Sequence, residues 1–197
     1  YHHLCLGGVQ RLLAACRLCH LTAFAKDRPM ITIDREGAYA HIEREKLLDR
    51  VMGPARFGKS SEILRRNRLP ADGLAFVAFD GKQMIGTVRL WNVNAGDAGD
   101  ALLLGPLAVD KIYSGSGVGA GLVYAALNAA QTAGHRSEIL AGDPDYYARF
   151  GFHAAPASGL LMPGHFDRHR FQAVQLGNDD VLSGSTGMLS ATGAMIH

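Results

Sequence analysis

A glycine-rich segment at residues 114–119 (SGSGVG) follows an apolar stretch and leads directly into a sequence with a helical pattern. The first peptide N–H groups of a helix have no partner within the helix, and they lie at the positive end of its dipole. Glycine has no Cβ that would keep a ligand away from these groups, and it accepts a positive φ. This segment therefore predicts a site for a phosphate or a diphosphate, with a simple tight turn as the alternative.

Two common phosphate-binding motifs do not fit this segment. Its glycines stand at every second position, which differs from the GxGxxG spacing of dinucleotide sites, and no acidic residue follows at a strand end about 20 residues later. No lysine follows the glycines, as the GxxxxGK[ST] loop of nucleotide triphosphatases would require. The spacing therefore argues against NAD and ATP, although a nucleotide-binding domain stays open as a minor alternative.

A second unusual feature lies upstream, where Gly105 and Pro106 interrupt an apolar run over residues 101–109. Proline cannot donate a hydrogen bond within a sheet, so it belongs at a bulge or at a place where strand pairing opens. A strand that opens just before an anion site leaves peptide groups free for a ligand. Pantetheine joined to a diphosphate, with amides along its length and phosphates at one end, has the matching form, which points to coenzyme A.

With these features the segment resembles the acetyl-CoA-binding core of the GNAT superfamily of N-acetyltransferases, whose loop pattern is [QR]xxGx[GA]. Residues 114–119 match this pattern except at its first position, where Ser114 replaces Gln or Arg. A second block, residues 145–152 (DYYARFGF), is similar to the later YxxxGF motif of the family. The resemblance covers about residues 30–176.

The resemblance implies an α+β fold with a mixed, mostly antiparallel central sheet flanked by helices, the acyl-CoA N-acyltransferase fold. It implies an N-acetyltransferase that moves an acetyl group from acetyl-CoA to a primary amine by direct attack in a ternary complex, without a metal. Tyr147 is the expected general acid for the departing thiolate. The residues expected to bind acetyl-CoA are Leu107, Ala108, Val109, Ser114, Gly115, Ser116, Gly117, Val118 and Gly119.

The general base stays unassigned. The acidic candidates also suit plain surface or helix-capping roles, and they are Glu43, Glu45, Asp143 and Asp145. A non-catalytic acyl-CoA-binding or regulatory module on the same fold is therefore the alternative function. Histidines at positions 165 and 169 have a metal-ligand spacing only on a helix, and Pro163 just before them argues for a loop.

Composition limits the partners. The 197 residues are 48% hydrophobic and carry a net charge of +2, with both signs interspersed, so nothing favours nucleic acid or an anionic membrane. No apolar run approaches the roughly 20 residues that span a bilayer. We expect a small-molecule or peptide amine as acceptor, and we allow for a homodimer. All three cysteines lie within residues 1–19, so a cytoplasmic location is expected.

The chain order suggests an irregular N-terminal extension at 1–29, an N-acetyltransferase domain at 30–177, and a C-terminal tail at 178–197 that is loose or added at a sheet edge. The extension contains a CxxCH sequence at 16–20, the pattern of c-type haem attachment, which we interpret as chance. Predicted helices cover 39–52, 61–68, 118–133 and 144–150, with Ser60 as the N-cap of the second and Gly134 ending the third. A polar loop is predicted at 92–99. Predicted strands cover 30–33, 74–79, 84–91, 101–109, 137–141, 152–155 and 171–176.

Overall fold

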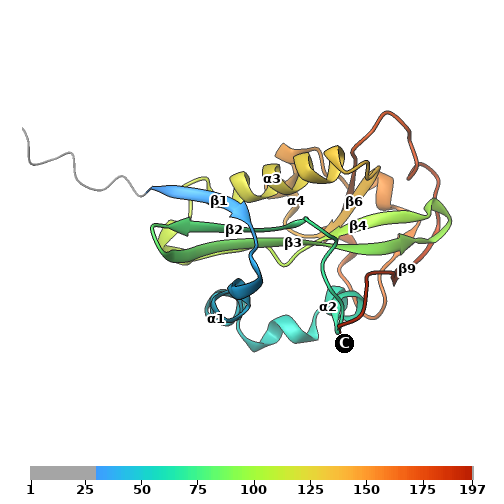
Figure 1. Cartoon of the computed structure of the whole chain (residues 1–197). Coiled ribbons are helices and arrows are strands. Elements are labelled where there is room, and N and C mark those ends of the chain that lie inside the picture. The colour runs from blue at the N-terminus through green and yellow to red at the C-terminus, as the bar shows by residue number, and fades with distance from the viewer. Residues whose placement is uncertain (1–29, 197) are drawn as a thin grey trace, which may run out of the picture. The chain divides into compact units, whose positions relative to one another are not determined.

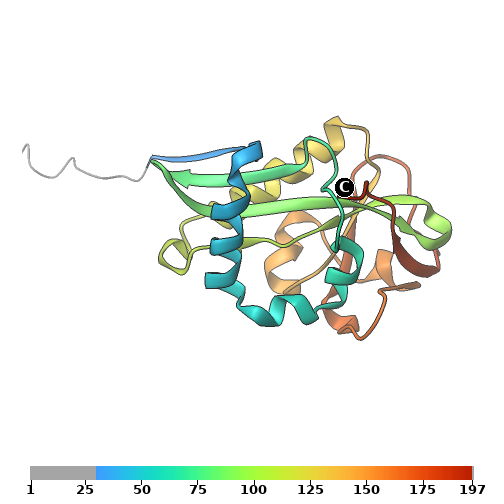
Figure 2. The same ribbon diagram turned by 60° about the horizontal axis from the view of Figure 1, so that its bottom comes forward.

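The computed structural model describes residues 30–196, so the predicted extension at 1–29 and its CxxCH sequence lie outside the described part. From residue 31 onward the chain forms a nine-stranded mixed sheet with helices on both faces (Figures 1 and 2). Neighbouring strands on the main path are antiparallel, except the parallel pair β4 and β6. The predicted fold class is therefore confirmed. The main path runs in the order β1 (Ile31–Arg35), β2 (Ala75–Asp80), β3 (Gln83–Ala95), β4 (Asp100–Leu104), β6 (Ser137–Ala141) and β8 (Phe171–Gln175).

The two faces of the sheet carry different helices, and Figure 1 shows α3 on one side with α1 and α2 on the other. Alternation along β4 explains this, because Leu102 and Leu104 pack in the cluster with α3, while Leu103 packs with Leu64 of α2. No helix within residues 30–196 is both long and apolar enough to cross a membrane. The α-helices of the described part are α1 (His41–Met52), α2 (Ser60–Arg65), α3 (Val118–Thr132) and α4 (Pro144–Tyr147).

Helix α3 is held to the sheet by one apolar stripe. Its buried residues recur at helical spacing and meet the buried side chains of β2, β3 and β4. Gly134, predicted to end this helix, has a φ of +83° just beyond the last turn. The stripe consists of Val118, Leu122, Val123, Ala126 and Ala130.

Strand β3 is long enough to change partners along both of its edges. On one edge it pairs with β2 and then with β9 (Gly187–Ala191). On the other edge it pairs with β4 and then with β5 (Ala108–Val109). Residues 105–107 separate β4 from β5, with Gly105 at a φ of +129° and Pro106 lacking an N–H group. The interruption predicted within the strand at 101–109 is confirmed.

Three local predictions need correction. Residues 92–95 continue β3 instead of forming a loop, because residues 92–94 pair with β4 and Ala95 pairs with Leu189 of β9. Lys59, and not Ser60, stands at the N-cap of α2, and the Ser60 hydroxyl faces the sulfur of Met162 at 3.9 Å. Residues 152–155 form only an isolated bridge between His153 and Ala173, since a 3₁₀ helix begins at Ala155.

Residues 178–196 take the second of the two forms predicted for the tail, an addition to the sheet. Its strand β9 pairs with β3 and, in parallel, with β7 (Leu160–Leu161). Leu182 and Leu189 are buried in the cluster that lies below β4 and β6. This segment therefore contributes to the core.

The burial of β9 predicts a contrast between two neighbouring residues. Leu189 is 2% exposed, whereas Met188 points outward and is 51% exposed. Leu189→Ala should lower the free energy of unfolding by about 2 to 4 kcal/mol, because it leaves a cavity. Met188→Ala, the control, should change it by about 0.5 kcal/mol or less. Urea unfolding measures both, and equal effects would show that β9 does not pack as described.

Candidate active site

Strands β4 and β6 pair over a very short length. Leu102 pairs with Glu138 and Leu103 with Ile139, and beyond this point β4 turns away at Gly105. A cavity of about 300 Å³ opens there, between the ends of the two strands and α4. Pro106 and Leu107 line one wall, and Ala141, Gly142 and Tyr147 line the other. The opened strand thus forms a cleft in the sheet.

The glycine segment presents peptide N–H groups that donate to no acceptor within the described chain. The amides of Ser114 and Ser116 are used locally, by the carbonyls of Lys111 and Tyr113. Gly117, with a φ of +88°, stands at the N-cap of α3. The free amides belong to Gly115, Gly117, Val118, Gly119 and Ala120. Five free donors at the positive end of a 15-residue helix suit an anion.

The open edge of β5 offers a further donor. The Asp110 amide donates to the Ile85 carbonyl of β3 at 2.8 Å. In an extended strand successive amides point to opposite sides, so the Val109 amide points away from β3. No other described strand pairs with β5 on that side. Ala108 pairs with Thr87, while Leu107 lines the cleft.

Tyr147, the predicted general acid, lies at the wall of the cleft. Its ring packs edge-on against Phe152 with centroids 5.8 Å apart, and a Cβ at position 142 would lie 2.2 Å from its Cε2 atom. Gly142 therefore leaves the space that the ring occupies. Burial, with the neighbouring Tyr146 and Glu138, raises the pKa of the Tyr147 hydroxyl well above its usual range. The hydroxyl keeps its proton at neutral pH, as a proton donor must.

Tyr146 links α4 to the glycine segment. A Cβ at position 119 would lie 2.7 Å from the Tyr146 hydroxyl, so Gly119 allows this ring to approach the first turn of α3. The ring also meets Phe150 edge-on with centroids 5.5 Å apart. The structure thus brings the two predicted motifs, 114–119 and 145–152, into contact, and Tyr146 also lines the cleft.

Comparisons with known proteins agree with this geometry. A family model described as "Acetyltransferase (GNAT) domain" matches residues 71–154, which include β3, the cleft and α4. The curated relative "Uncharacterized N-acetyltransferase YhbS" of Escherichia coli (strain K12) is 36% identical over 167 residues, covering 82% of this chain and 93% of the relative. The chain belongs to the GNAT family of acetyltransferases. The family resemblance inferred from the sequence is confirmed.

Solved structures of other GNAT proteins share the fold. The crystal structure of Escherichia coli YhbS in complex with CoA has a TM-score of 0.66 and 30% identity, covering 82% of this chain and 89% of that one. A GNAT family acetyltransferase from Brucella melitensis in complex with acetyl-CoA has a TM-score of 0.60 at 23% identity, covering 83% and 97%. Within residues 30–196 of this GNAT protein, no three His, Cys, Asp or Glu residues are grouped as a metal site.

The predicted bases of this GNAT protein occupy different surroundings. Glu43 is exposed and pairs with Lys46 at 3.0 Å. Asp143 accepts a hydrogen bond from the Asp145 amide at 3.0 Å and so caps α4. Glu45 alone among the four candidates lines a second cavity, of about 350 Å³. This second cavity shares Arg56, Arg65 and Pro106 with the cleft.

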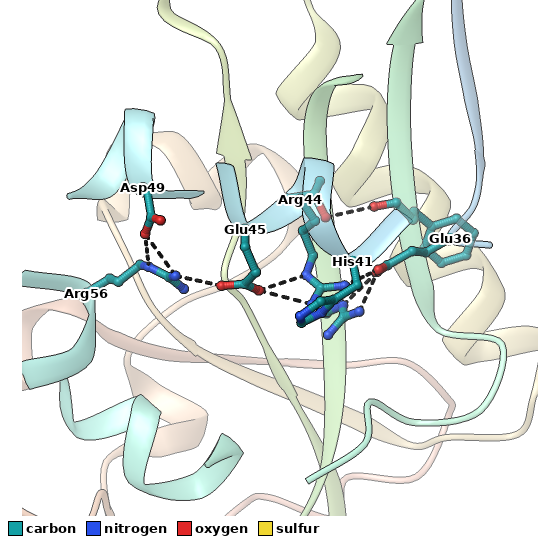
Figure 3. Close-up of polar contacts among 9 residues, drawn as sticks. Glu36, His41, Arg44, Glu45, Asp49 and Arg56 are labelled. Atoms are coloured by element: carbon teal, nitrogen blue, oxygen red, sulfur yellow. Dashed lines mark hydrogen bonds and ion pairs between the residues drawn. The ribbon is translucent and has the colours of Figure 1, made fainter. Parts of the chain in front are cut away.

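An arginine–carboxylate network borders the second cavity (Figure 3). Arg56 Nη2 donates to Glu45 at 2.6 Å and to Asp49 at 3.0 Å. Arg44 Nη2 donates to the other Glu45 oxygen at 3.0 Å, and Arg44 also pairs with the buried Glu36. Burial acts to raise the pKa of Glu45, but the two guanidinium groups outweigh it and lower the pKa. Glu45 is therefore an ionised ion-pair partner and a weak base.

The sequence analysis missed these arginines. Six of them stand between positions 44 and 68, mixed with acidic residues, so the near-neutral net charge conceals them. A count of arginine in that segment alone would have indicated an unusual surface. The six are Arg44, Arg50, Arg56, Arg65, Arg66 and Arg68.

Glu138 on β6 is a buried acidic residue near Tyr147. The residue is fully buried, and neither carboxyl oxygen has a hydrogen-bond partner among the described residues. Its neighbours across the sheet are Leu102 and Val174. Burial raises the pKa of the Glu138 carboxyl to about 8. At neutral pH the folded protein therefore holds this carboxyl mainly in its neutral form.

This pKa predicts a pH-dependent stability. The unfolded chain ionises Glu138 near pH 4.3, whereas the folded protein does so near pH 8, so stability falls with rising pH between these values. Glu138→Leu should remove this decline, and its stability relative to the wild type should rise by up to about 1.4 kcal/mol per pH unit. Urea unfolding at pH 5, 6, 7 and 8 measures it. The exposed control Glu43→Gln should keep the wild-type slope, and a parallel slope for Glu138→Leu would refute the assignment.

Proposed function

We propose that this GNAT protein transfers an acetyl group from acetyl-CoA to a primary amine by direct attack while both are bound. The observation that carries the proposal is the row of free amides at the start of α3, beside the open edge of β5. The crystal structure of the similar YhbS in complex with CoA supports the same ligand class. A cytoplasmic location and a homodimer stay predictions.

The residues of the cleft fit acetyl-CoA in three parts. The free amides of Gly115 and of residues 117–120 would hold the diphosphate. The Val109 amide would bind a pantetheine amide, as an added strand would. Pro106 and Leu107 would then lie beside the thioester, in the cavity of about 300 Å³. Ser114 is exposed and makes no side-chain contact that would replace the usual Gln or Arg.

Acetyl-CoA, when bound, supplies the activated acetyl thioester. The N–H group of Leu107, which lines the cleft, would stabilise the oxyanion that forms on the carbonyl oxygen, because the Ala108 amide faces β3. As the C–N bond forms and the C–S bond breaks, the Tyr147 hydroxyl would give its proton to the sulfur. The ammonium proton would leave to water, because the arginines hold Glu45 as an ion pair.

A non-catalytic acyl-CoA-binding module remains the second candidate. The amine would bind in the second cavity, which joins the cleft at Pro106, and Glu45 is the one candidate base there. The observation in favour of a non-catalytic module is that Arg44 and Arg56 bind Glu45. Such a module would bind acetyl-CoA and release no free CoA with any amine. A thiol assay over an amine panel separates the two functions.

Diphosphate binding predicts a charge effect at Gly115. This glycine is exposed with a φ of +78° and has open space around its Cα, and Asn and Asp are the residues that tolerate such a φ best. Gly115→Asp should weaken CoA binding at least about tenfold relative to Gly115→Asn, since only the Asp repels the diphosphate. Isothermal titration calorimetry gives both dissociation constants. Equal values would place the diphosphate elsewhere.

The role of Tyr147 predicts a selective loss of rate. Tyr147→Phe should lower kcat by about 10² to 10⁴, the range of general acid catalysis, and change the acetyl-CoA dissociation constant less than about threefold. Tyr124→Phe, at a half-exposed tyrosine on α3, is the control and should keep kcat. Release of free CoA with an accepted amine measures the rate. An unchanged kcat in Tyr147→Phe would falsify the role.

A further inference from the structure

The second cavity, on the acceptor side of Pro106, is bordered by an excess of positive charge. Four carboxylates lie in this wall or in its ion pairs, namely Glu36, Glu45, Asp49 and Glu62. The arginines of the same wall are Arg44, Arg56, Arg65, Arg66, Arg68 and Arg89. Six guanidinium groups against four carboxylates leave a surplus of two positive charges.

The carboxylates of the wall are already engaged. Glu45 accepts from both Arg44 and Arg56, and Glu62 accepts from Arg65 at 2.8 Å. Glu36 accepts from Arg44 and Arg89. An acceptor with several positive charges would therefore have to compete with arginines for each of these carboxylates.

Arg65 lines both cavities, and one of its N–H donors has no hydrogen-bond partner in the described chain. Its side chain is 8% exposed, and its Nε atom is buried with no hydrogen-bond partner among the described residues. Its Nη1 atom would lie 3.8 Å from a Cβ at Gly105, which places the guanidinium beside the interrupted strand. A buried donor without a partner lowers stability, unless a ligand accepts a hydrogen bond from it. Arg66 beside it is exposed and has no ion-pair partner in the described chain.

We propose that the acceptor is a small amine that also carries an anionic group, a carboxylate or a phosphate, and that Arg65 binds this group with help from Arg66. Guanidinium groups bind both anions by paired N–H donors. A cavity of about 350 Å³ accommodates a metabolite-sized molecule. The inference rests on the proposed acetyl transfer and excludes polyamines as preferred acceptors.

The single tryptophan of the chain provides a binding assay that needs no known acceptor. Trp91 lines the second cavity, and its indole N–H donates to the Gly105 carbonyl. With the cleft saturated by CoA and ionic strength held constant, inorganic phosphate and malonate are titrated separately while Trp91 fluorescence is recorded. We expect a saturable change with at least one anion and none with spermidine, and the two titrations distinguish a phosphate site from a carboxylate site.

Three variants connect the signal to the arginines. Arg65→Gln should weaken anion binding at least tenfold, and Arg136→Gln, an exposed arginine outside this cavity, should leave it unchanged. If Arg65→Gln fails to fold, Arg66→Gln on the surface takes its place and should weaken binding at least threefold. A response to neither anion, or the same dissociation constant in the wild type and in the folded arginine variants, overturns the proposal.

Acetyl transfer gives a second, separable result. Glycine is compared with glycinamide, and O-phosphoethanolamine with ethanolamine, by release of free CoA. The anionic member of at least one pair should have a kcat/KM at least tenfold higher. Faster reaction of the members that lack the anionic group, or of spermidine, overturns the anion proposal and leaves acetyl transfer standing. If acetyl-CoA binds but no amine releases CoA, acetyl transfer fails, and the fluorescence titration still decides whether Arg65 binds an anion.

Discussion

Between Leu104 and Ala108 the main chain leaves its ladder with β3, because Pro106 has no N–H to donate and Gly105 adopts a backbone angle that other residues avoid. The cleft and the open edge of β5 both follow from this break. The turn carries β4 away from β6, opens the cleft between them, and leaves the outer edge of β5 without a partner strand among residues 30–196. The same turn lies between the two cavities, so the cleft and the second cavity share Pro106.

The second cavity is lined by charged side chains, whereas the free donors at the start of α3 are peptide N–H groups. Desolvation of charged groups costs several kcal/mol each, and an apolar contact of the same volume often stabilises a fold as well or better. A buried pair such as Arg44 and Glu36 is therefore weak support for stability alone. Its effect is to fix α1 against β3, through Arg44 on the helix and Arg89 on the strand, so that the remaining guanidinium groups have a defined position.

Local pattern was sufficient to predict the elements that hold the cleft. The glycines at 115–119 and the Gly105–Pro106 pair act through their own backbone conformation, which can be predicted without knowing the tertiary contacts. The change of strand partners along β3 was harder to predict. The asparagines within residues 92–95 favour a loop by composition, and the segment is a strand only because β4 and β9 pair with it. The arginines that line the second cavity could not be predicted as one group from the sequence, since Arg44, Arg65 and Arg89 come together only through tertiary packing.

The strand β9 has a consequence for how the molecule is made. Its partners in β3, residues 93–95, stand almost a hundred positions earlier in the chain. Contacts of such high sequence separation carry a large loop-closure cost and form late. While a ribosome is still synthesising residues 187–191, the far end of β3 keeps a bare edge that other nascent chains could bind. Among the strands within residues 30–196, the last one in chain order thus closes an edge of β3 that is bare until then.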